Sequence, residues 1–263
     1  MELSVPDRIQ IMPVGYEVKR VTEAAKKFKP DKVILITHSE NDNLANECLS
    51  NIAQEFENKG VDYEVRDCNL FDLHASLGEI AAAIYEHGED NVYVNTSTGS
   101  KITAIAGMIA SMVTGSTPYY VRATNYDGPP SEIESYDELP RYPIDHPELD
   151  QIATMEYIKR MAAVEHDPSK GELIQFAEAN ELRYVDQNVA GKGKYRLLDS
   201  HVIDPLESEG YIEVIKEGRK SLVTLTESGR NAIQAYRYLI PNLDSLNWDP
   251  SQRIEQTSSA ESN

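Results

Sequence analysis

The chain contains few cysteines and no arrangement of residues typical of a metal centre. Cys48 and Cys68 are its two cysteines among 263 residues. Two are too few for a disulfide framework, so a reducing cytoplasm is the expected compartment. Neither cysteine has a C-x-x-C partner, and the six histidines never pair at the spacing of zinc ligands. We therefore expect no metal site and no cofactor.

The chain is also short of basic residues and of long apolar runs. It has 25 Lys and Arg against 44 Asp and Glu, a formal net charge of -19. That balance excludes a broad basic surface for nucleic acid or membrane but leaves room for a small basic patch. The most apolar run, 102–113, has 12 residues, too few to span a bilayer. The N-terminal segment lacks the basic start and the long apolar stretch of a signal peptide. We therefore expect no membrane partner.

Three common motifs of α/β enzymes are absent. There is no G-x-x-x-x-G-K-[ST] loop, no G-x-G-x-x-G after the first expected strand and no G-x-S-x-G elbow. The sequence thus gives no support to a Walker A phosphate site, an ordinary NAD enzyme or an α/β-hydrolase.

The first half of the chain alternates between strand and helix patterns. Short apolar or β-branched runs predict strands, and apolar residues spaced three and four apart predict helices. The strands are expected at 8–14, 32–37, 61–66, 91–95 and 117–123, and the helices at 16–28, 44–59, 77–85 and 101–113. Asp72 or Ser76 is the expected cap of the third helix. This order predicts an α/β Rossmann-like parallel sheet over residues 1–124.

The second half has a different pattern. Residues 125–147 are rich in proline and acids, which argues against a long regular element. We interpret them as a connector that packs on the sheet through Ile133, Tyr136, Leu139 and Tyr142. An α+β domain is expected over 148–240, with helices at 148–163 and 169–179, a basic segment at 192–196, further helices, strands at 211–215 and 221–225, and a last helix capped by Thr226. Residues 241–263 form a polar tail.

Ligands of parallel α/β sheets bind where the strands end, close to helix N-termini. Gly15 and Tyr16 follow the first expected strand, and Ser39 follows the second. After the fourth strand come seven consecutive small, polar or cationic residues, Asn95 to Lys101. Their hydroxyls, the helix N-terminus and the lysine charge favour an anion such as phosphate. The alternative is that Thr98 or Ser100 merely caps the helix.

The segment Asn95-Thr-Ser-Thr-Gly-Ser-Lys101 resembles the motif of CARF domains (CRISPR-associated Rossmann fold), written as an Asn and then Thr-Gly-Gly-Thr-Lys. It departs from that motif at the middle glycine and at Ser100, which stands where the family has threonine. The resemblance covers residues 8–124. It implies a homodimer that binds a cyclic oligoadenylate or related small nucleotide through Asn95, Thr96, Thr98, Gly99, Ser100 and Lys101. Strand-end geometry adds Gly15, Tyr16 and Ser39.

The second half resembles a winged helix-turn-helix. The run Leu206-x-x-x-Gly210-Tyr211-Ile212 is similar to the end of a recognition helix, and Leu225-Thr226-Glu227-x-Gly229-Arg230 is similar to the exit from a wing. If Ser200 caps the recognition helix, Pro205 lies just past its first turn and is expected to bend it. The resemblance implies contacts with double-stranded DNA from Lys192, Lys194, Arg196, Ser200 and His201 near that helix, and from Lys216, Arg219 and Lys220 on the wing.

Together the two resemblances match the layout of a class of archaeal transcription regulators, and the acidity points to a haloarchaeal branch. The acids are unevenly divided: residues 1–150 carry a net charge of -14 and residues 151–263 carry -5. The leading hypothesis is a homodimeric, ligand-responsive DNA-binding regulator that is not an enzyme. Two alternatives stay open. One is a ring nuclease-like enzyme that cleaves its own ligand without metal, and the other is a protein-interaction module that uses the winged helix.

Overall fold

A computed structural model describes residues 5–38, 43–88, 90–124, 132–140, 142, 146–184, 189–218, 220–240 and 246–248. The chain divides into two compact units, Met1–His146 and Pro147–Asn263. Each is described by itself.

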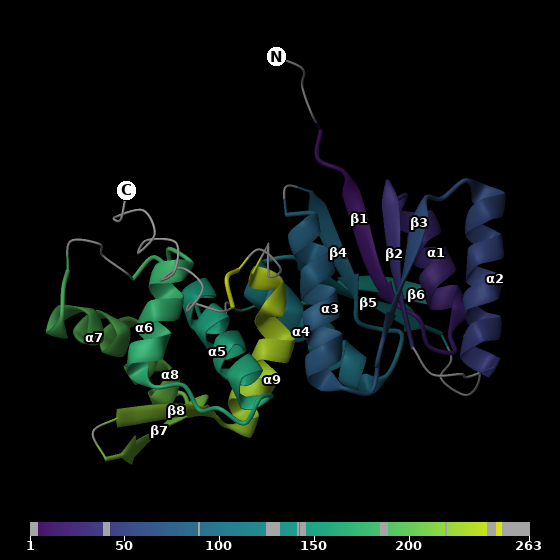
Figure 1. The fold of residues 1–263 in the computed structure, drawn as a ribbon. Coiled ribbons are helices and arrows are strands. Elements are labelled where there is room, and N and C mark those ends of the chain that lie inside the picture. Colours follow the sequence, from purple (N-terminus) through teal and green to yellow (C-terminus); the bar gives the residue numbers. More distant parts are fainter. Residues whose placement is uncertain are drawn as a thin grey trace, which may run out of the picture. The chain divides into compact units, whose positions relative to one another are not determined.

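The first unit is built on a six-stranded, mostly parallel sheet (Figure 1). In the order β3-β2-β1-β4-β5-β6, five strands are parallel to their neighbours and the sixth is antiparallel to β5. The strands are β1 (Arg8–Pro13), β2 (Lys32–His38), β3 (Tyr63–Cys68), β4 (Asn91–Asn95), β5 (Thr117–Ala123) and β6 (Ile133–Glu138). The predicted Rossmann-like sheet is thereby confirmed.

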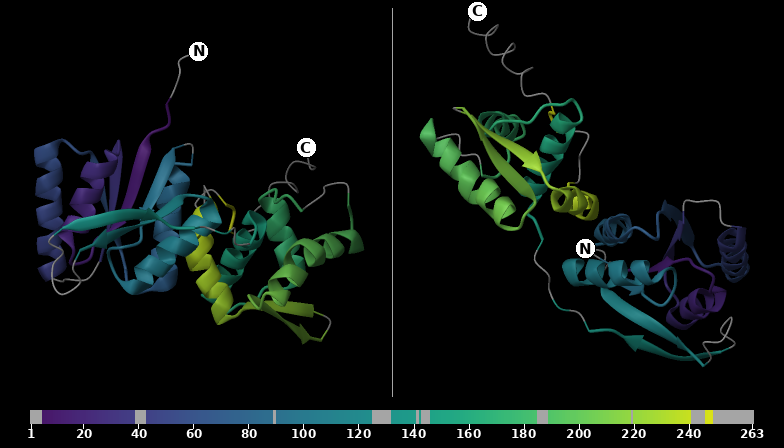
Figure 2. Two further views of the ribbon diagram at one scale, coloured as in Figure 1. Left: turned by 180° about the vertical axis from the view of Figure 1, so that it is seen from behind. Right: turned by 90° about the horizontal axis from the view of Figure 1, so that it is seen from below.

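Helices cover both faces of this sheet, as the two views of Figure 2 show. They are α1 (Val18–Phe28), α2 (Asn43–Lys59), α3 (Leu73–Glu86) and α4 (Lys101–Thr114). The chain runs from β1 through β2 to β3, then returns past β1 to β4 and β5. Because β-α-β connections are right-handed, this reversal places α1 and α2 on one face and α3 and α4 on the other. It also opens a crevice between the carboxyl ends of β1 and β4.

The start of α3 shows how a polar side chain fixes a helix boundary. Asp72 is the N-cap, and its carboxylate accepts hydrogen bonds from the backbone N–H groups of His74 and Ala75, each at 2.9 Å. The helix therefore begins at Leu73, four residues before the predicted start. Ser76, the alternative cap, is buried inside the helix.

The acidic, proline-rich segment after β5 contains a short strand that was not predicted. Strand β6 pairs with the edge of β5 and so satisfies backbone groups that would otherwise be open. Two of the four residues expected to pack on the sheet, Ile133 and Tyr136, do so, and the Tyr136 hydroxyl donates to the Glu23 carbonyl at 3.1 Å. Tyr142 is exposed. This segment therefore belongs to the first unit and does not merely link the two.

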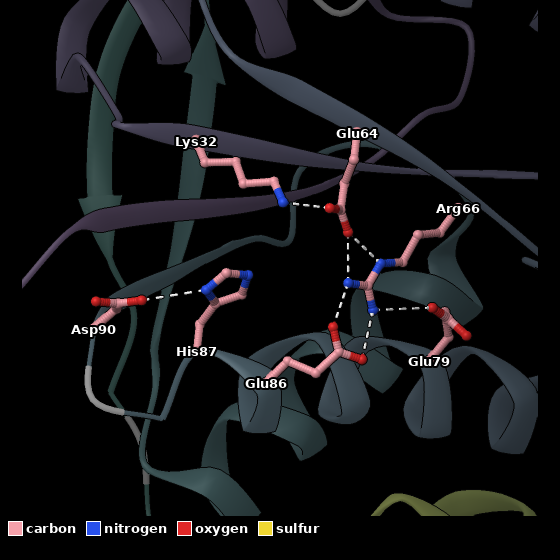
Figure 3. A network of polar contacts seen from close by, with 7 residues as sticks. All are labelled: Lys32, Glu64, Arg66, Glu79, Glu86, His87 and Asp90. Atoms are coloured by element: carbon pink, nitrogen blue, oxygen red, sulfur yellow. Dashed lines mark hydrogen bonds and ion pairs between the residues drawn. The ribbon is translucent and has the colours of Figure 1, made fainter.

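A charge network joins α3 to β3, the edge strand of the sheet (Figure 3). Arg66 pairs with Glu64, with Glu79 at 3.6 Å and with Glu86 at 2.6 Å, and Glu64 also accepts from Lys32. Burial by itself would raise the pKa of Glu64, but hydrogen bonds from Lys32 and Arg66 outweigh it and hold that pKa low. Burial raises the pKa of Glu79 despite the nearby guanidinium. The single guanidinium of Arg66 thus pairs with three carboxylates at once.

Replacing Arg66 with glutamine is expected to lower the free energy of unfolding at pH 7 by roughly 2 kcal/mol, because three carboxylates then face one another. In the wild type, Glu64 contributes stability above its unfolded pKa, and that contribution is lost as the pH falls through the lower folded pKa. The deficit of the variant should therefore shrink below about pH 4. Urea denaturation at pH 7 and at about pH 3, below the usual pKa of a glutamate, measures it.

Arg122→Gln is the matched control for this experiment. Arg122 pairs with Asp137 at 3.1 Å across β5 and β6, and both side chains are well exposed. Its loss should cost less than about 1 kcal/mol. An Arg66→Gln deficit that is the same at both pH values would contradict the electrostatic account.

The second unit is a small helical domain with a two-stranded wing (Figure 1). Its elements are α5 (Leu149–Ala162), α6 (Lys170–Ala179), α7 (Lys192–Leu198), the π-helical segment η1 (Asp199–Ile203), α8 (Asp204–Ser208), β7 (Ile212–Glu217), β8 (Lys220–Leu225), α9 (Glu227–Tyr236) and η2 (Arg237–Leu239). The predicted cap Thr226 is confirmed at the start of α9, and Ser169 begins α6 in a capping box with Glu172. A single bridge from Ser169 to Leu222 extends the wing.

Residues 246–248 pack back onto this unit. The Trp248 ring stacks on Phe176 at 5.6 Å, and the Arg160 guanidinium lies over it at 4.0 Å. Asn180 and Asn247 exchange two hydrogen bonds, at 2.6 and 3.0 Å. Trp248, which lies in the stretch expected to form a polar tail, therefore packs on the second unit.

Candidate functional site

A pocket of about 90 Å³ lies at the carboxyl ends of the parallel strands in the first unit. It sits at the reversal between β1 and β4, where parallel α/β sheets bind ligands. Its lining comes from the segments after β1, β3 and β4, from the last residue of β2 and from α2, and consists of Val14, Gly15, Tyr16, His38, Ala45, Leu70, Phe71, Gly99 and Ser100. Four of the predicted ligand residues, Gly15, Tyr16, Gly99 and Ser100, are therefore brought together here.

Two glycines allow the turns after β1 and β4 to approach each other closely. A Cβ at Gly15 would lie 3.0 Å from the Cα and N of Gly99. Gly99 has a φ of +78°, and a Cβ there would lie 2.9 Å from the Cβ of Pro13. Both positions therefore exclude a side chain, and the backbone of the two turns forms part of the pocket wall.

Most of the polar side chains in the Asn95–Lys101 turn point inward and hold the turn together. The Asn95 amide donates to the carbonyl of Arg20 at 3.2 Å, and its oxygen accepts from the backbone N–H of Ser97 at 2.9 Å. Thr96 donates its hydroxyl to Tyr119 O at 3.0 Å. Thr98 donates to Pro13 O at 2.6 Å. The side chains of Asn95, Thr96 and Thr98 are buried and serve the loop, so they do not face the pocket directly.

The next two residues begin α4. Ser100 is the N-cap, accepting from the backbone N–H of Thr103 at 3.0 Å, as the alternative interpretation of the turn expected. Its hydroxyl also donates to Leu70 O at 2.6 Å, and the Thr103 hydroxyl donates to the same carbonyl at 2.7 Å. These bonds tie the loop after β3 to the start of α4. Lys101 is exposed in the first turn of α4, where its charge adds to the positive end of the helix dipole.

Arg20, on α1, supports the Asn95–Lys101 turn and was not identified from the sequence. It is buried, and it donates to the Ser97 carbonyl at 3.0 Å and pairs with Glu17 at 3.3 Å. Its guanidinium also lies 5.8 Å from the centre of the Tyr120 ring. Burial raises the pKa of Glu17, and Arg20 partly offsets that rise. The signal in the sequence that could have identified Arg20 was a cation at a position of α1 that faces the core.

Three aromatic rings stand at or near the pocket. The His38 and Phe71 rings meet edge to face at 4.9 Å, and the Phe71 side chain is 62% exposed. Tyr16 is 54% exposed beside them. The strand-end rule predicted ligand residues after β1, β2 and β4 but not after β3, although Leu70 and Phe71 come shortly after the end of that strand. Ser39 lies outside the described residues.

The second unit places its candidate DNA contacts on one helix and the wing. The helix runs without a break from α7 through η1 to α8, so the basic segment forms its first turn and Ser200 lies inside it. The prediction that Ser200 caps the helix is therefore wrong; Gly191 stands at the N-cap. Six of the predicted DNA contacts are exposed on the helix and wing: Lys192, Arg196, Ser200, His201, Lys216 and Lys220.

Two of the predicted DNA contacts stand apart from this set. Lys194 is half-buried and pairs with Glu178 of α6. Arg219, on the wing, lies outside the described residues.

Other candidate chemistry in the described residues is sparse. Cys48 and Cys68 are buried, and burial raises the pKa of Cys68 to about 11, which leaves it a poor nucleophile. No three His, Cys, Asp or Glu side chains gather as metal ligands in the described ranges. Within that same part of the chain, every helix is too short or too polar to cross a membrane.

Two family models match the chain, one on each unit. Residues 8–126 match a model described as HFX_2341_N:-like, N-terminal, and residues 150–237 match the DUF6293 C-terminal winged helix domain. A Methanocaldococcus jannaschii protein described as Uncharacterized protein MJ1513 is 35% identical over 124 residues, which are 43% of this chain and 37% of that protein.

Solved structures resemble the chain more distantly. Can2 from Sulfobacillus thermosulfidooxidans, in complex with cyclic tetra-adenylate, is 13% identical with a TM-score of 0.39 over 88% of this chain and 64% of its own. Enterococcus italicus Csm6, bound to cyclic hexa-2'-fluoro-hexa-dAMP, is 9% identical with a TM-score of 0.42 over 78% and 56%. Protein VC1899 from Vibrio cholerae is 12% identical with a TM-score of 0.37 over 88% and 65%.

The chain spans less than two thirds of the length of each of these four proteins. What the matches and the sheet topology establish together is that the chain joins a Rossmann-like α/β unit to a winged-helix unit that matches the DUF6293 C-terminal domain.

Proposed function

We propose that the protein is a homodimeric, ligand-responsive regulator that binds double-stranded DNA. In this proposal the first unit binds a cyclic oligoadenylate or related small nucleotide, and the winged helix of the second unit contacts DNA. The observation that carries the proposal is the strand-end pocket with Lys101 and the start of α4 beside it.

The pocket combines two chemistries that a nucleotide needs. Its lining includes apolar groups and the rings of Tyr16, His38 and Phe71, which suit the flat face of a base. The backbone N–H groups at the start of α4 and the Lys101 charge suit a phosphate. The inward bonds of Asn95, Thr96 and Thr98 support the ligand indirectly, because they fix the turn that presents these groups.

Helix α4 also supports a dimer. Between Ile102 and Thr114 it carries no charged residue, in a chain of which 26% is charged. Ile102 and Ile105 are exposed on its first two turns, next to Lys101. A second copy that packs on this face would bring two Lys101 side chains and two pockets near one twofold axis. A cyclic ligand with repeated phosphates fits such an arrangement.

The second unit offers few but well-placed cations. Lys192 and Arg196 are exposed on the first half of the recognition helix, and Lys216 and Lys220 on the wing. A helix and a wing are the positions from which winged helices contact phosphates. With few phosphates neutralised, DNA binding should depend only weakly on salt.

Calorimetry with cyclic tetra- and hexa-adenylate tests the ligand half of the proposal. We expect one of the two to bind the wild type, and Lys101→Ala to weaken that binding by roughly tenfold, since a charge-assisted contact is lost. Lys27→Ala is the control, because Lys27 is exposed in the last turn of α1, away from the pocket. Absence of binding by both nucleotides would remove the ligand claim.

Two further readouts separate the remaining alternatives. Incubation with a bound nucleotide, followed by chromatography, detects linear product if the unit cleaves its ligand. A mobility shift with the DNA beside the protein's own gene, at several salt concentrations, tests DNA binding. A shift that is unchanged by Lys220→Ala and Arg219→Ala would contradict the assigned wing contacts, and no shift at all would favour the protein-interaction module.

A further inference from the structure

Pro205 lies in α8, near the end of the recognition helix (the continuous helix formed by α7, η1 and α8), and it removes one helical hydrogen-bond donor. In an α-helix the N–H of residue 205 would donate to the carbonyl of His201. Proline has no N–H, so this bond cannot form. A backbone carbonyl that loses its helical donor takes water or another protein group as its donor, and at this exposed position a side chain supplies it.

The helix adapts to Pro205 by widening one turn. In η1 the backbone N–H of Asp204 donates to the carbonyl of Asp199, five residues earlier. Three core residues, Leu198, Val202 and Leu206, are buried at intervals of four. In a regular α-helix each interval of four would turn the next residue by about 40° away from the core. The wider π-helical turn offsets this drift, so all three side chains reach the core.

The missing donor comes from α5. The side-chain amide nitrogen of Gln151 donates to the His201 carbonyl at 2.9 Å. The oxygen of the same amide accepts from the backbone N–H of Glu148 at 2.9 Å, completing the capping box of α5. Glu148 is the second residue of the unit that begins at Pro147. One planar amide therefore joins the point where the chain enters the unit to the π-helical turn of the recognition helix.

This turn separates two halves of the helix that differ in charge. Lys192 and Arg196 are exposed on the first half, and Asp204 and Glu207 are exposed on the second. Ser200 and His201 are exposed at the turn itself. Only the first half is suited to approach DNA phosphates, so its direction relative to the wing decides which contacts can form together.

We propose that Gln151 is a positioning residue of the recognition helix. Its amide transmits the position of the entering chain at Glu148 to the turn at His201, and so sets the direction of the basic half of the helix. This proposal rests on the DNA-binding role proposed above. A change in the connector between the two units thereby reaches the DNA-contacting surface through two hydrogen bonds of one side chain.

Gln151→Glu isolates the bond to His201. The glutamate keeps an oxygen for the Glu148 N–H and a favourable charge in the first turn of α5, but it has no donor for the His201 carbonyl. Hydrogen exchange of the amides between Ser200 and Ser208 should become roughly tenfold faster, as expected for the loss of one hydrogen bond. DNA affinity should fall by a similar factor, and added nucleotide should change it less than in the wild type.

Pro205→Ala provides the rescue. Alanine restores the N–H at position 205 and removes the reason for the wide turn, so the turn is expected to close as a regular α-helix in which that N–H donates to the His201 carbonyl in place of Gln151. In the Pro205→Ala background, Gln151→Glu should therefore change amide exchange by less than about twofold. Equal effects in both backgrounds, or no effect of Gln151→Glu on exchange in the wild-type background, would overturn the proposal.

The two readouts also separate this proposal from the one on which it rests. If the wild type binds no DNA, the DNA-binding role fails, and with it the transmission to DNA. The exchange measurements on the full chain then still decide whether Gln151 holds the recognition helix. If the wild type binds DNA and Gln151→Glu speeds exchange without changing DNA affinity, Gln151 is structural and the positioning role is wrong.

Discussion

Replacing Gly99 with alanine is expected to abolish nucleotide binding to the first unit while leaving a folded protein. The φ of +78° at Gly99 is strained for any residue with a side chain, and the new Cβ would lie 2.9 Å from the Cβ of Pro13. One atom belongs to the turn after β4 and the other to the last residue of β1, directly before the turn at Gly15, so relief of the contact must move the two turns apart. We expect a loss of about 2 kcal/mol in stability and a loss of more than about 100-fold in affinity by calorimetry.

Gly115→Ala is a close control for this variant. Gly115 ends the same helix, α4, that Gly99 precedes, and its φ of +83° imposes the same backbone strain. A Cβ at Gly115 has no atom within 4 Å. The control should lose about 1 kcal/mol of stability and keep its nucleotide affinity. If both variants lose affinity equally, strain in α4 and not the approach of the two turns controls the site.

The sheet and its helices were predictable because apolar residues follow a different spacing in strands and in helices. Continuous apolar runs such as 33–36 mark strands buried on both faces, and the α4 stretch from Ile102 is both apolar and long enough for a helix. Strand β6 lacked such a signal: its sequence, IESYDE, carries three acids, and it forms because the edge of β5 offers backbone partners. Pairing of that kind depends on tertiary structure and cannot be read from local pattern.

The position of the site was predictable, but the direction of its side chains was not. The strand-end rule correctly located Gly15, Tyr16, Gly99 and Ser100 at one pocket. The rule gives no information on which polar groups turn inward, and Asn95, Thr96 and Thr98 do so because carbonyls of Arg20, Tyr119 and Pro13 need donors. These carbonyls come from α1, β5 and β1, far away in sequence. The same reason hid Arg20, whose partners lie up to 77 residues away.

Replacing Ile105 with glutamate is expected to convert a dimer into a monomer. Ile105 is 50% exposed, midway along the uncharged face of α4 that continues through the half-buried Ile109 and Met112. In a chain with 44 acids, nothing in the fold of the first unit requires one helix to be free of charge on its outer face. Burying an unpaired carboxylate in a dimer interface costs about 3 kcal/mol or more, so the dissociation constant should rise by at least about 100-fold.

Sedimentation velocity over a range of concentrations measures this change, and Val65→Glu is the control. Val65 is 45% exposed on the edge strand β3, so it places the same charge on a different apolar site of the same unit. Dissociation by Val65→Glu but not by Ile105→Glu would move the interface to the sheet edge. A monomeric wild type, with and without nucleotide, would remove the dimer from the proposal. Ile102 and Ile105 adjoin Lys101 on α4. Loss of the dimer through α4 should therefore also weaken nucleotide binding, so Ile105→Glu tests the dimer interface and the ligand site together.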